Sequence, residues 1–292
     1  MTQDSSAAPV ALTIAGSDCS AGAGIQADLK TFTAFGVYGL TTVTCVVAET
    51  PLEVTRVLEC EPELVAEQVN LLLRRYPVDA IKTGMLGGSA IVETVALALQ
   101  QHRARGGSFR LVVDPVMMAS AGGSLLAPNA VASMVEKLIP LASVVTPNQY
   151  EAAVLLGADP AMAGELQGDA ALELAARLGV PVLLKGGDRT GPQATDWLAV
   201  EGLCRAISSP RVDAVTSHGS GCTFAAGIAA QLALGASLDE AVRQSKGFVT
   251  AALEQALSWQ QPTAAPDGAA QTISALHPLP LQPAPGEVSD WE

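Results

Sequence analysis

Short runs of apolar, β-branched residues alternate with longer helical patterns from about residue 10 to residue 257. The runs expected to form strands are Val10–Ala15, Leu40–Ala48, Ala80–Lys82, Leu111–Asp114, Ser143–Thr146, Val182–Lys185 and Trp197–Val200. The helical patterns between them are Ile25–Phe35, Leu64–Arg75, Ala90–Arg103, Ala130–Leu138, Glu151–Leu156 and Ala170–Leu178. Because the strands are apolar on both faces, this alternation predicts an α/β fold with a mostly parallel, doubly wound sheet and helices on both faces. Ligands bind such a sheet at the carboxyl ends of its strands, so the residues that follow each strand are the candidates for function.

The domain organisation is simple. No interdomain linker or internal repeat interrupts the alternation, which predicts a single domain over residues 1–259. Residues 260–292 are rich in Pro, Ala and Gln and have no periodic apolar face, so we expect them to be a disordered tail.

Composition argues against several classes of function. A formal charge of −13 and only 4% aromatic residues disfavour nucleic-acid binding, which needs clustered cations and stacking rings. Residues 1–9 show no secretory signal, and the longest weakly polar stretch, Cys222–Leu238, is too short and too polar to span a bilayer. The five cysteines form no CxxC pair and the three histidines are scattered, which favours reduced thiols and argues against a histidine-based metal site. We therefore expect a cytoplasmic protein with no membrane or nucleic-acid partner.

The segment His218–Thr223 reads His-Gly-Ser-Gly-Cys-Thr and precedes a helical run of small residues. Gly219, Ser220 and Gly221 let successive backbone N–H groups point at one spot, which at a helix N-terminus forms an anion cradle. The thiol of Cys222 would lie beside the cradle, where a lowered pKa would let it accept a proton from an attacking hydroxyl. The alternative is a glycine-rich turn before a buried helix, with Cys222 as a small apolar residue.

A second glycine-rich segment follows the first predicted strand. Gly22-Ala23-Gly24 with Ala27 matches the dinucleotide-binding pattern GxGxxA, and Glu49 lies near the distance expected for its ribose-binding acid. The first glycine comes several residues after the strand ends, whereas the pattern requires it in the strand–helix turn itself. A dinucleotide-dependent oxidoreductase using Gly22–Ala27 therefore ranks below the phosphate-cradle hypothesis.

Polar side chains also follow three later strands. Asn148 and Glu151 come after one of them, Asp114 ends another, and together they could hold Mg²⁺ through water. Lys185 follows an apolar strand in a chain poor in cations, which suits a phosphate contact. The structural alternatives are a capped helix start at Asn148 and a charged turn at Lys185. No GxxxxGK[ST] motif is present, so ATP would have to use the cradle at Gly219–Cys222.

Eight motifs in order carry a resemblance to a known family. They are AGSD (Ala15–Asp18), GAGIQADLKTF (Gly22–Phe32), GVYG (Gly36–Gly39), KTGML (Lys82–Leu86), VDPVM (Val113–Met117), TPNxxEA (Thr146–Ala152), KGG (Lys185–Gly187) and HGSGCT (His218–Thr223). In this order they resemble the hydroxymethylpyrimidine/phosphomethylpyrimidine kinases of thiamine biosynthesis, a branch of the ribokinase-like superfamily. The resemblance covers nearly the whole chain except the tail.

The resemblance implies a ribokinase-like three-layer sandwich, ATP with Mg²⁺, and two successive phosphorylations of 4-amino-5-hydroxymethyl-2-methylpyrimidine, in a homodimer. Family positions that contact the pyrimidine correspond to Gly16, Asp28, Met85, Val116 and Cys222. The metal and phosphate region corresponds to Asp114, Asn148 and Glu151, the phosphate contact to Lys185, and the anion hole to Gly219–Cys222. Glu49 replaces the family's usual glutamine, which reads the aminopyrimidine edge, so a pyridoxal kinase remains the neighbouring alternative.

Overall fold

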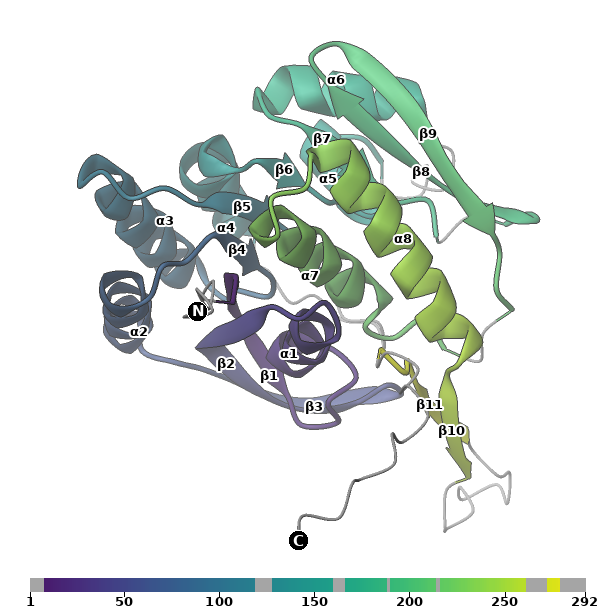
Figure 1. Ribbon diagram of the computed structural model, residues 1–292, viewed down its shortest axis with the longest axis horizontal. Coiled ribbons are helices and arrows are strands. Elements are labelled where there is room, and N and C mark those ends of the chain that lie inside the picture. Colours follow the sequence, from purple (N-terminus) through teal and green to yellow (C-terminus); the bar gives the residue numbers. More distant parts are fainter. Residues whose placement is uncertain are drawn as a thin grey trace, which may run out of the picture.

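A nine-stranded sheet forms the middle layer of the computed structural model, which describes residues 8–118, 128–159, 166–187, 190–213, 216–260 and 272–278 (Figure 1). The strand order is β3-β2-β1-β4-β5-β6-β7-β8-β9. Their bounds are β1 Val10–Asp18, β2 Tyr38–Thr50, β3 Glu53–Glu59, β4 Ala80–Thr83, β5 Arg110–Val113, β6 Val144–Val145, β7 Val182–Leu184, β8 Gln193–Val200 and β9 Leu203–Pro210. The strands from β2 to β7 pair in parallel, whereas β3 at one edge and β8 and β9 at the other are antiparallel.

Helices cover both faces of the sheet. One face carries α1 (Gly24–Ala34), α7 (Ser220–Ala233) and α8 (Leu238–Glu254), which lie in front of the sheet in Figure 1. The other face carries α2 (Pro62–Arg75), α3 (Ser89–Ala104), α4 (Pro128–Ser133), the short turns Met134–Leu138 and Ile139–Leu141, α5 (Gln149–Leu156) and α6 (Gly168–Leu178). The predicted α/β three-layer sandwich is confirmed.

Each central strand contributes to two apolar cores because successive side chains point to opposite faces. Leu111 and Val113 of β5 pack toward α2 and α3, whereas Val112 between them packs toward α7. All three are fully buried. This explains why the strands read as continuous apolar runs in the sequence rather than as an alternating pattern.

The C-terminal region differs from the sequence prediction of a disordered tail from residue 260. Strand β11 (Thr272–Ala275) pairs antiparallel with β10 (Leu257–Gln260), and Leu276 is buried beyond it. The backbone N–H of His277 donates to the carbonyl of Ala252 at the end of α8. Backbone pairing and one buried leucine order this segment without an extended apolar face, which is the reason that composition did not reveal it. Residues 261–271 and 279–292 of the predicted tail lie outside the described residues.

None of the helices in the described ranges is long and apolar enough to cross a membrane. The parallel strands direct their carboxyl ends toward one edge of the sheet, where α7 begins. A bulge in β1 between Ala15 and Ser17 bends the strand at that edge. Gly16 lies in the bulge, where a Cβ atom would come within 2.7 Å of the Cys45 sulfur.

Candidate active site

A cavity of about 710 Å³ opens at the carboxyl ends of the parallel strands. Twelve of the thirteen residues predicted from the sequence line it: Gly16, Glu49, Met85, Asp114, Val116, Asn148, Glu151, Lys185, Gly219, Ser220, Gly221 and Cys222. Asp28 is not among the lining residues. The fold therefore brings together residues that are far apart in the sequence, up to the 206 positions that separate Gly16 from Cys222.

The anion cradle is formed where α7 begins. Gly219 caps the helix with a φ of +80°, and a Cβ atom there would lie 1.8 Å from the carbonyl oxygen of Gly22. Glycine is required at this position for two reasons. The backbone has a left-handed conformation, and the backbones of the two glycine loops are in contact. The N–H of Ser220 donates to the carbonyl of Ser217, so Gly221 and Cys222 supply the N–H groups that point toward a ligand.

Lys185 completes the cradle from the opposite side. Its ammonium lies so close that a Cβ atom on Gly221 would be 3.2 Å from Nζ. Lys185 Nζ also donates to Asp114 Oδ1 at 2.8 Å, and both side chains are nearly buried. Burial alone would lower the pKa of Lys185, but Asp114 and Glu151 more than offset it, and the pKa stays above its usual value. The cradle thus has a permanent positive charge beside it.

Asn148 and Glu151 form a reciprocal capping box at the start of α5. The Asn148 side chain accepts from the Glu151 N–H, and the Glu151 carboxylate accepts from the N–H groups of Asn148 and Met117. Burial raises the pKa of Glu151, against the opposing effect of Lys185. The structural alternative of a capped helix is therefore correct, and the same two residues also line the cavity.

The Cys222 thiol does not have the lowered pKa expected from the sequence. Burial raises its pKa to about 11, although Lys82 and the N–H of Gly24 act in the opposite direction. The expectation was wrong because a helix N-terminus lowers a thiol pKa only when water or net positive charge can support the anion. Here Cys222 is half-buried in the cavity wall, and Asp28 and Asp114 partly cancel the nearby lysines.

Asp28 is placed behind the cavity wall instead of on it. Its carboxylate is fully buried and pairs with Lys82 Nζ at 2.8 Å, and Thr13 Oγ1 donates to it at 2.6 Å. Lys82, at the end of β4, is the member of this pair that lines the cavity. A lysine in the otherwise apolar run Ala80–Lys82 is the signal in the sequence that could have identified Lys82.

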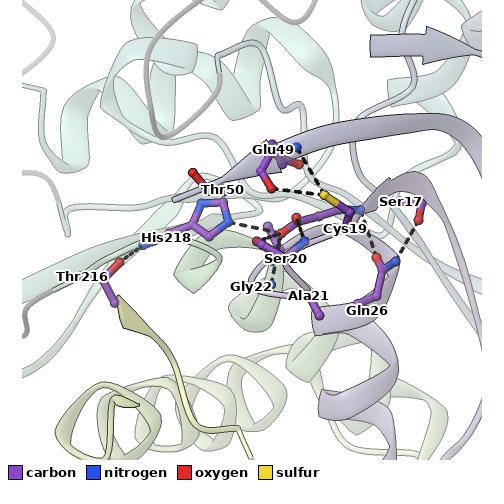
Figure 2. A network of polar contacts seen from close by, with 12 residues as sticks. Ser17, Cys19, Ser20, Ala21, Gly22, Gln26, Glu49, Thr50, Thr216 and His218 are labelled. Carbon is purple, nitrogen blue, oxygen red and sulfur yellow. Dashed lines mark hydrogen bonds and ion pairs between the residues drawn. The ribbon is translucent and has the colours of Figure 1, made fainter. Parts of the chain in front are cut away.

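Asp18 joins the two glycine loops through hydrogen bonds, and this network was also missed by sequence reasoning. Figure 2 labels its partners Ser20, Gly22 and His218. Its carboxylate accepts from the N–H groups of Ser20, Gly22 and Ala23, from the Ser20 hydroxyl, and from His218 Nε2 at 3.2 Å. Burial would raise the pKa of Asp18, but the hydrogen bonds from His218, Ser20 and Ala23 hold it at about 2. Both residues occur in motifs noted above, AGSD and HGSGCT, whose spacing gave no sign that they meet.

The same network removes the dinucleotide-binding hypothesis for Gly22–Ala27. The N–H groups of Gly22 and Ala23, which a pyrophosphate would need, already donate to the Asp18 carboxylate. A second anion at this position would be repelled by that charge. The N–H groups of the first glycine loop therefore bind the Asp18 carboxylate of the protein itself.

Glu49 lies at the end of β2 and faces the cavity beside this network (Figure 2). Its backbone is held by Cys19, whose sulfur accepts from the Glu49 N–H at 3.4 Å and whose thiol donates to the Glu49 carbonyl at 3.3 Å. Burial raises the pKa of the Glu49 carboxyl, as does Asp18, while His218 acts in the opposite direction. Glu49 thus places a partly enclosed carboxyl group at this end of the cavity.

The far end of the cavity lies between β8, β9 and α8. Lys246 Nζ pairs with Asp196 Oδ2 at 2.6 Å, and Asp196 Oδ1 accepts from the N–H of Gly186, the residue after Lys185. Arg211 donates to three backbone carbonyls in the same region. None of these residues was selected from the sequence. Apolar side chains of α8, including Val249 and Leu253, complete this wall.

Comparison with known proteins identifies the family. The family model described as phosphomethylpyrimidine kinase matches residues 18–266. The chain belongs to this family. A hydroxymethylpyrimidine/phosphomethylpyrimidine kinase of Salmonella typhimurium is 42% identical over 249 residues, which are 84% of this chain and 91% of the relative.

Solved structures agree with the family assignment. A phosphomethylpyrimidine kinase of Clostridium difficile has a TM-score of 0.69 at 34% identity, covering 83% of this chain and 98% of the other. A Staphylococcus aureus pyridoxal kinase in complex with AMP-PCP and pyridoxal has a TM-score of 0.77 at 32% identity, covering 93% and 94%. These similarities confirm both the fold predicted from the sequence and its kinase class.

Proposed function

We propose that this chain transfers the γ-phosphate of ATP to the hydroxymethyl group of 4-amino-5-hydroxymethyl-2-methylpyrimidine, and then phosphorylates the monophosphate to the diphosphate. The observation that carries the proposal is that one cavity contains an anion cradle, a lysine beside it, a thiol at its edge and a polar ring-binding end at Glu49. Family membership supports the same substrate class.

Positioning and charge neutralisation dominate phosphoryl transfer, because its transition state is loose and the charge spreads over the equatorial oxygens. The N–H groups of Gly221 and Cys222 and the ammonium of Lys185 would surround the transferred phosphoryl group. ATP would occupy the end of the cavity between β8, β9 and α8, with its phosphates directed at the cradle. A solved relative in complex with AMP-PCP supports ATP as the donor.

Cys222 would act on the acceptor. The hydroxyl proton moves to the Cys222 thiolate as the hydroxyl oxygen bonds to the γ-phosphorus. The bond from that phosphorus to the β,γ-bridging oxygen breaks, and ADP leaves with the electron pair. The raised pKa means that only a small fraction of the thiol is deprotonated at neutral pH, so this step should accelerate as the pH rises.

The acidic residues fit a Mg²⁺ ion that is held mainly by the phosphates of ATP. In the described ranges, no group of three or more His, Cys, Asp or Glu side chains could hold a metal by itself. Asp114 and Glu151 do provide two carboxylates beside the cradle, the number that a nucleotide-bound Mg²⁺ usually takes from a protein. When bound, the ion would neutralise phosphate charge, and Asp114 and Glu151 would orient it directly or through water.

A pyridoxal kinase is the second candidate, because solved pyridoxal kinases share the fold at 32–34% identity. ATP consumption with the aminopyrimidine, its monophosphate and pyridoxal, measured side by side, separates the two. We expect both pyrimidines to be phosphorylated faster than pyridoxal. Phosphorylation of pyridoxal alone would overturn the proposal, and Cys222→Ala run in parallel controls for contaminating kinases.

We also propose that the protein is a cytoplasmic homodimer. Exposed apolar side chains gather on the β2–β3 edge and on α2, where Tyr38, Leu58 and Leu64 are each at least 48% exposed. Apolar exposure of this kind is typical of a surface that another subunit covers. Sedimentation of the full chain at micromolar concentration tests whether the protein is a dimer, and a monomer would refute the proposed dimer.

A further inference from the structure

Lys82 is a buried cation in the wall of the cavity. Its Nζ donates to Asp28 Oδ1 at 3.0 Å and to Oδ2 at 2.8 Å, and the Thr13 hydroxyl binds the same carboxylate. All three residues have no solvent exposure, yet Lys82 borders the cavity that also contains Cys222. The ammonium is therefore held in one position by Asp28, in a residue that borders the cavity.

The backbone is shaped to seat this ammonium. A Cβ atom on Gly84 would lie 2.8 Å from Lys82 Nζ and 3.1 Å from the Cβ of Ala15. Only glycine leaves room for the lysine head between the ends of β1 and β4. Gly84 belongs to the KTGML motif, so the lysine and the glycine that accommodates it lie two residues apart.

Stability alone gives little reason for such a pair. The free energy needed to desolvate two buried charges is about as large as the free energy of their attraction. Replacing such a pair with apolar residues of similar volume therefore often leaves the stability of the protein unchanged or increases it. Burial alone would lower the pKa of Lys82, but Asp28 more than offsets it, so the lysine stays charged. A charge kept at this cost beside a reaction centre suggests a role in the reaction.

Cys222 lines the same cavity as Lys82. Among the side chains that influence the thiol, Lys82 favours its deprotonation, whereas burial, Asp28 and Asp114 oppose it. Lys185 is the second cation near the sulfur, but it is also bound to Asp114 and faces the cradle. The Gly24 N–H is the remaining favourable contribution.

We propose that Lys82 is a positioning residue for the proton transfer: Asp28 fixes its ammonium near Cys222, where the positive charge stabilises the thiolate that takes the hydroxyl proton. This inference rests on the proposed function, in which Cys222 is the proton acceptor. In this proposal Asp28 acts by holding the Lys82 ammonium in place and does not itself contact the substrate. No atom is transferred to or from Lys82, which keeps its proton throughout.

The test is the rate at which iodoacetamide alkylates Cys222 in the free protein between pH 7 and pH 10, followed by mass spectrometry of the peptide that contains it. Only the thiolate reacts, so the rate follows its fraction. Lys82→Met should slow alkylation at pH 9 about tenfold, the effect of a one-unit rise in the thiol pKa. A merely structural role would loosen the site and accelerate the reaction. An unchanged or faster rate would overturn the proposal.

Asp28→Asn provides a second variant with the same expected sign. Without the carboxylate the ammonium is neither fixed in place nor kept charged against burial, so alkylation at pH 9 should be slower than in the unmodified protein. An unchanged or faster rate would contradict the role given to Asp28. This variant also keeps the proposal testable if Lys82→Met does not fold.

Lys246→Met is the matched control. It removes another lysine that is buried, ion-paired and in the wall of the same cavity, but whose partner is Asp196 at the far end. Its alkylation rate should equal that of the unmodified protein, and a tenfold decrease would show that losing any buried lysine suffices. Because no substrate is present, failure here leaves the proposed kinase activity untouched, and failure of the substrate assay leaves this result standing.

Discussion

Among single residues, Glu49 is the one that we expect to have the largest effect on which substrate the cavity selects. A glutamine offers one donor and one acceptor to the amino group and adjacent nitrogen of an aminopyrimidine, whereas an ionised carboxylate only accepts. A ring nitrogen that carries a proton would turn this edge into a charge-assisted, bidentate pair with Glu49. The phenolate of pyridoxal would be repelled at the same place.

We therefore expect Glu49→Gln to reduce the preference for the aminopyrimidine over pyridoxal, by about tenfold for one charge-assisted hydrogen bond. The measurement is kcat/KM for both alcohols in the two proteins. Equal selectivity in both would show that the carboxylate does not meet the ligand. Faster turnover of pyridoxal than of the aminopyrimidine in the unmodified protein would contradict the assignment outright.

The raised pKa of Cys222 leads to a pH prediction. A base must be deprotonated to act, and the thiol pKa is about 11, so kcat/KM should rise with pH about tenfold per unit between pH 7 and pH 9. Cys222→Ala should lose this slope together with about 10²-fold of kcat, with little change in ATP affinity. A flat profile in the unmodified protein would remove Cys222 as the base.

Among the secondary-structure elements, those with strong periodicity were predictable. The helices and the central parallel strands follow from apolar periodicity and from glycine and proline punctuation, and their predicted and observed bounds differ mostly by a few residues. Strands β3 and β9 were missed because they are edge strands with mostly exposed side chains, which leave no apolar run. The hairpin of β10 and β11 was missed for the same reason.

This hairpin lies partly within residues 260–292, which the sequence predicted to be a disordered tail and which could then be removed without effect. Truncation there removes β11 and the buried Leu276, a loss of about 2 kcal/mol for one leucine, so Tm should fall by several degrees. Truncation after Pro278 keeps both and is the control, for which we expect no change. Equal melting temperatures for the two truncated proteins and the full chain would restore the disordered-tail hypothesis.

At the level of the whole molecule, the site depends on contacts between segments far apart in the sequence. Spacing predicted which strand ends meet at one edge, and twelve of thirteen candidate residues line the cavity. Spacing could not show that Asp18 contacts His218, that Lys82 forms an ion pair with Asp28, or that Asp196 accepts a hydrogen bond from the residue after Lys185. Such pairings depend on side-chain directions that only the packed fold defines.

Asp18 should contribute to stability in a defined pH window. Its folded-state pKa of about 2 lies below its ordinary value of 3.8, so its contribution of about 2 kcal/mol is complete above about pH 4 and disappears as the pH falls toward 2. Asp18→Asn should therefore be less stable at pH 7 and approach the unmodified protein at pH 2, as measured by urea unfolding. Asp239→Asn, in a solvent-exposed ion pair, is the control and should change stability by less than about 1 kcal/mol. A pH-independent difference for Asp18→Asn would contradict the assignment.

The backbone contact between Gly219 and Gly22 has a consequence for how such enzymes diverge. Neither Gly219 nor Gly22 can accept a side chain without displacing the other loop, so mutation at this contact cannot remodel the two loops one at a time. New specificity has to arise at positions outside this contact, such as Glu49 and Met85, which reach the cavity from β2 and from the segment after β4. A lineage with this architecture can exchange one hydroxymethylated heterocycle for another through a few substitutions at the rim, while its chemistry is inherited unchanged.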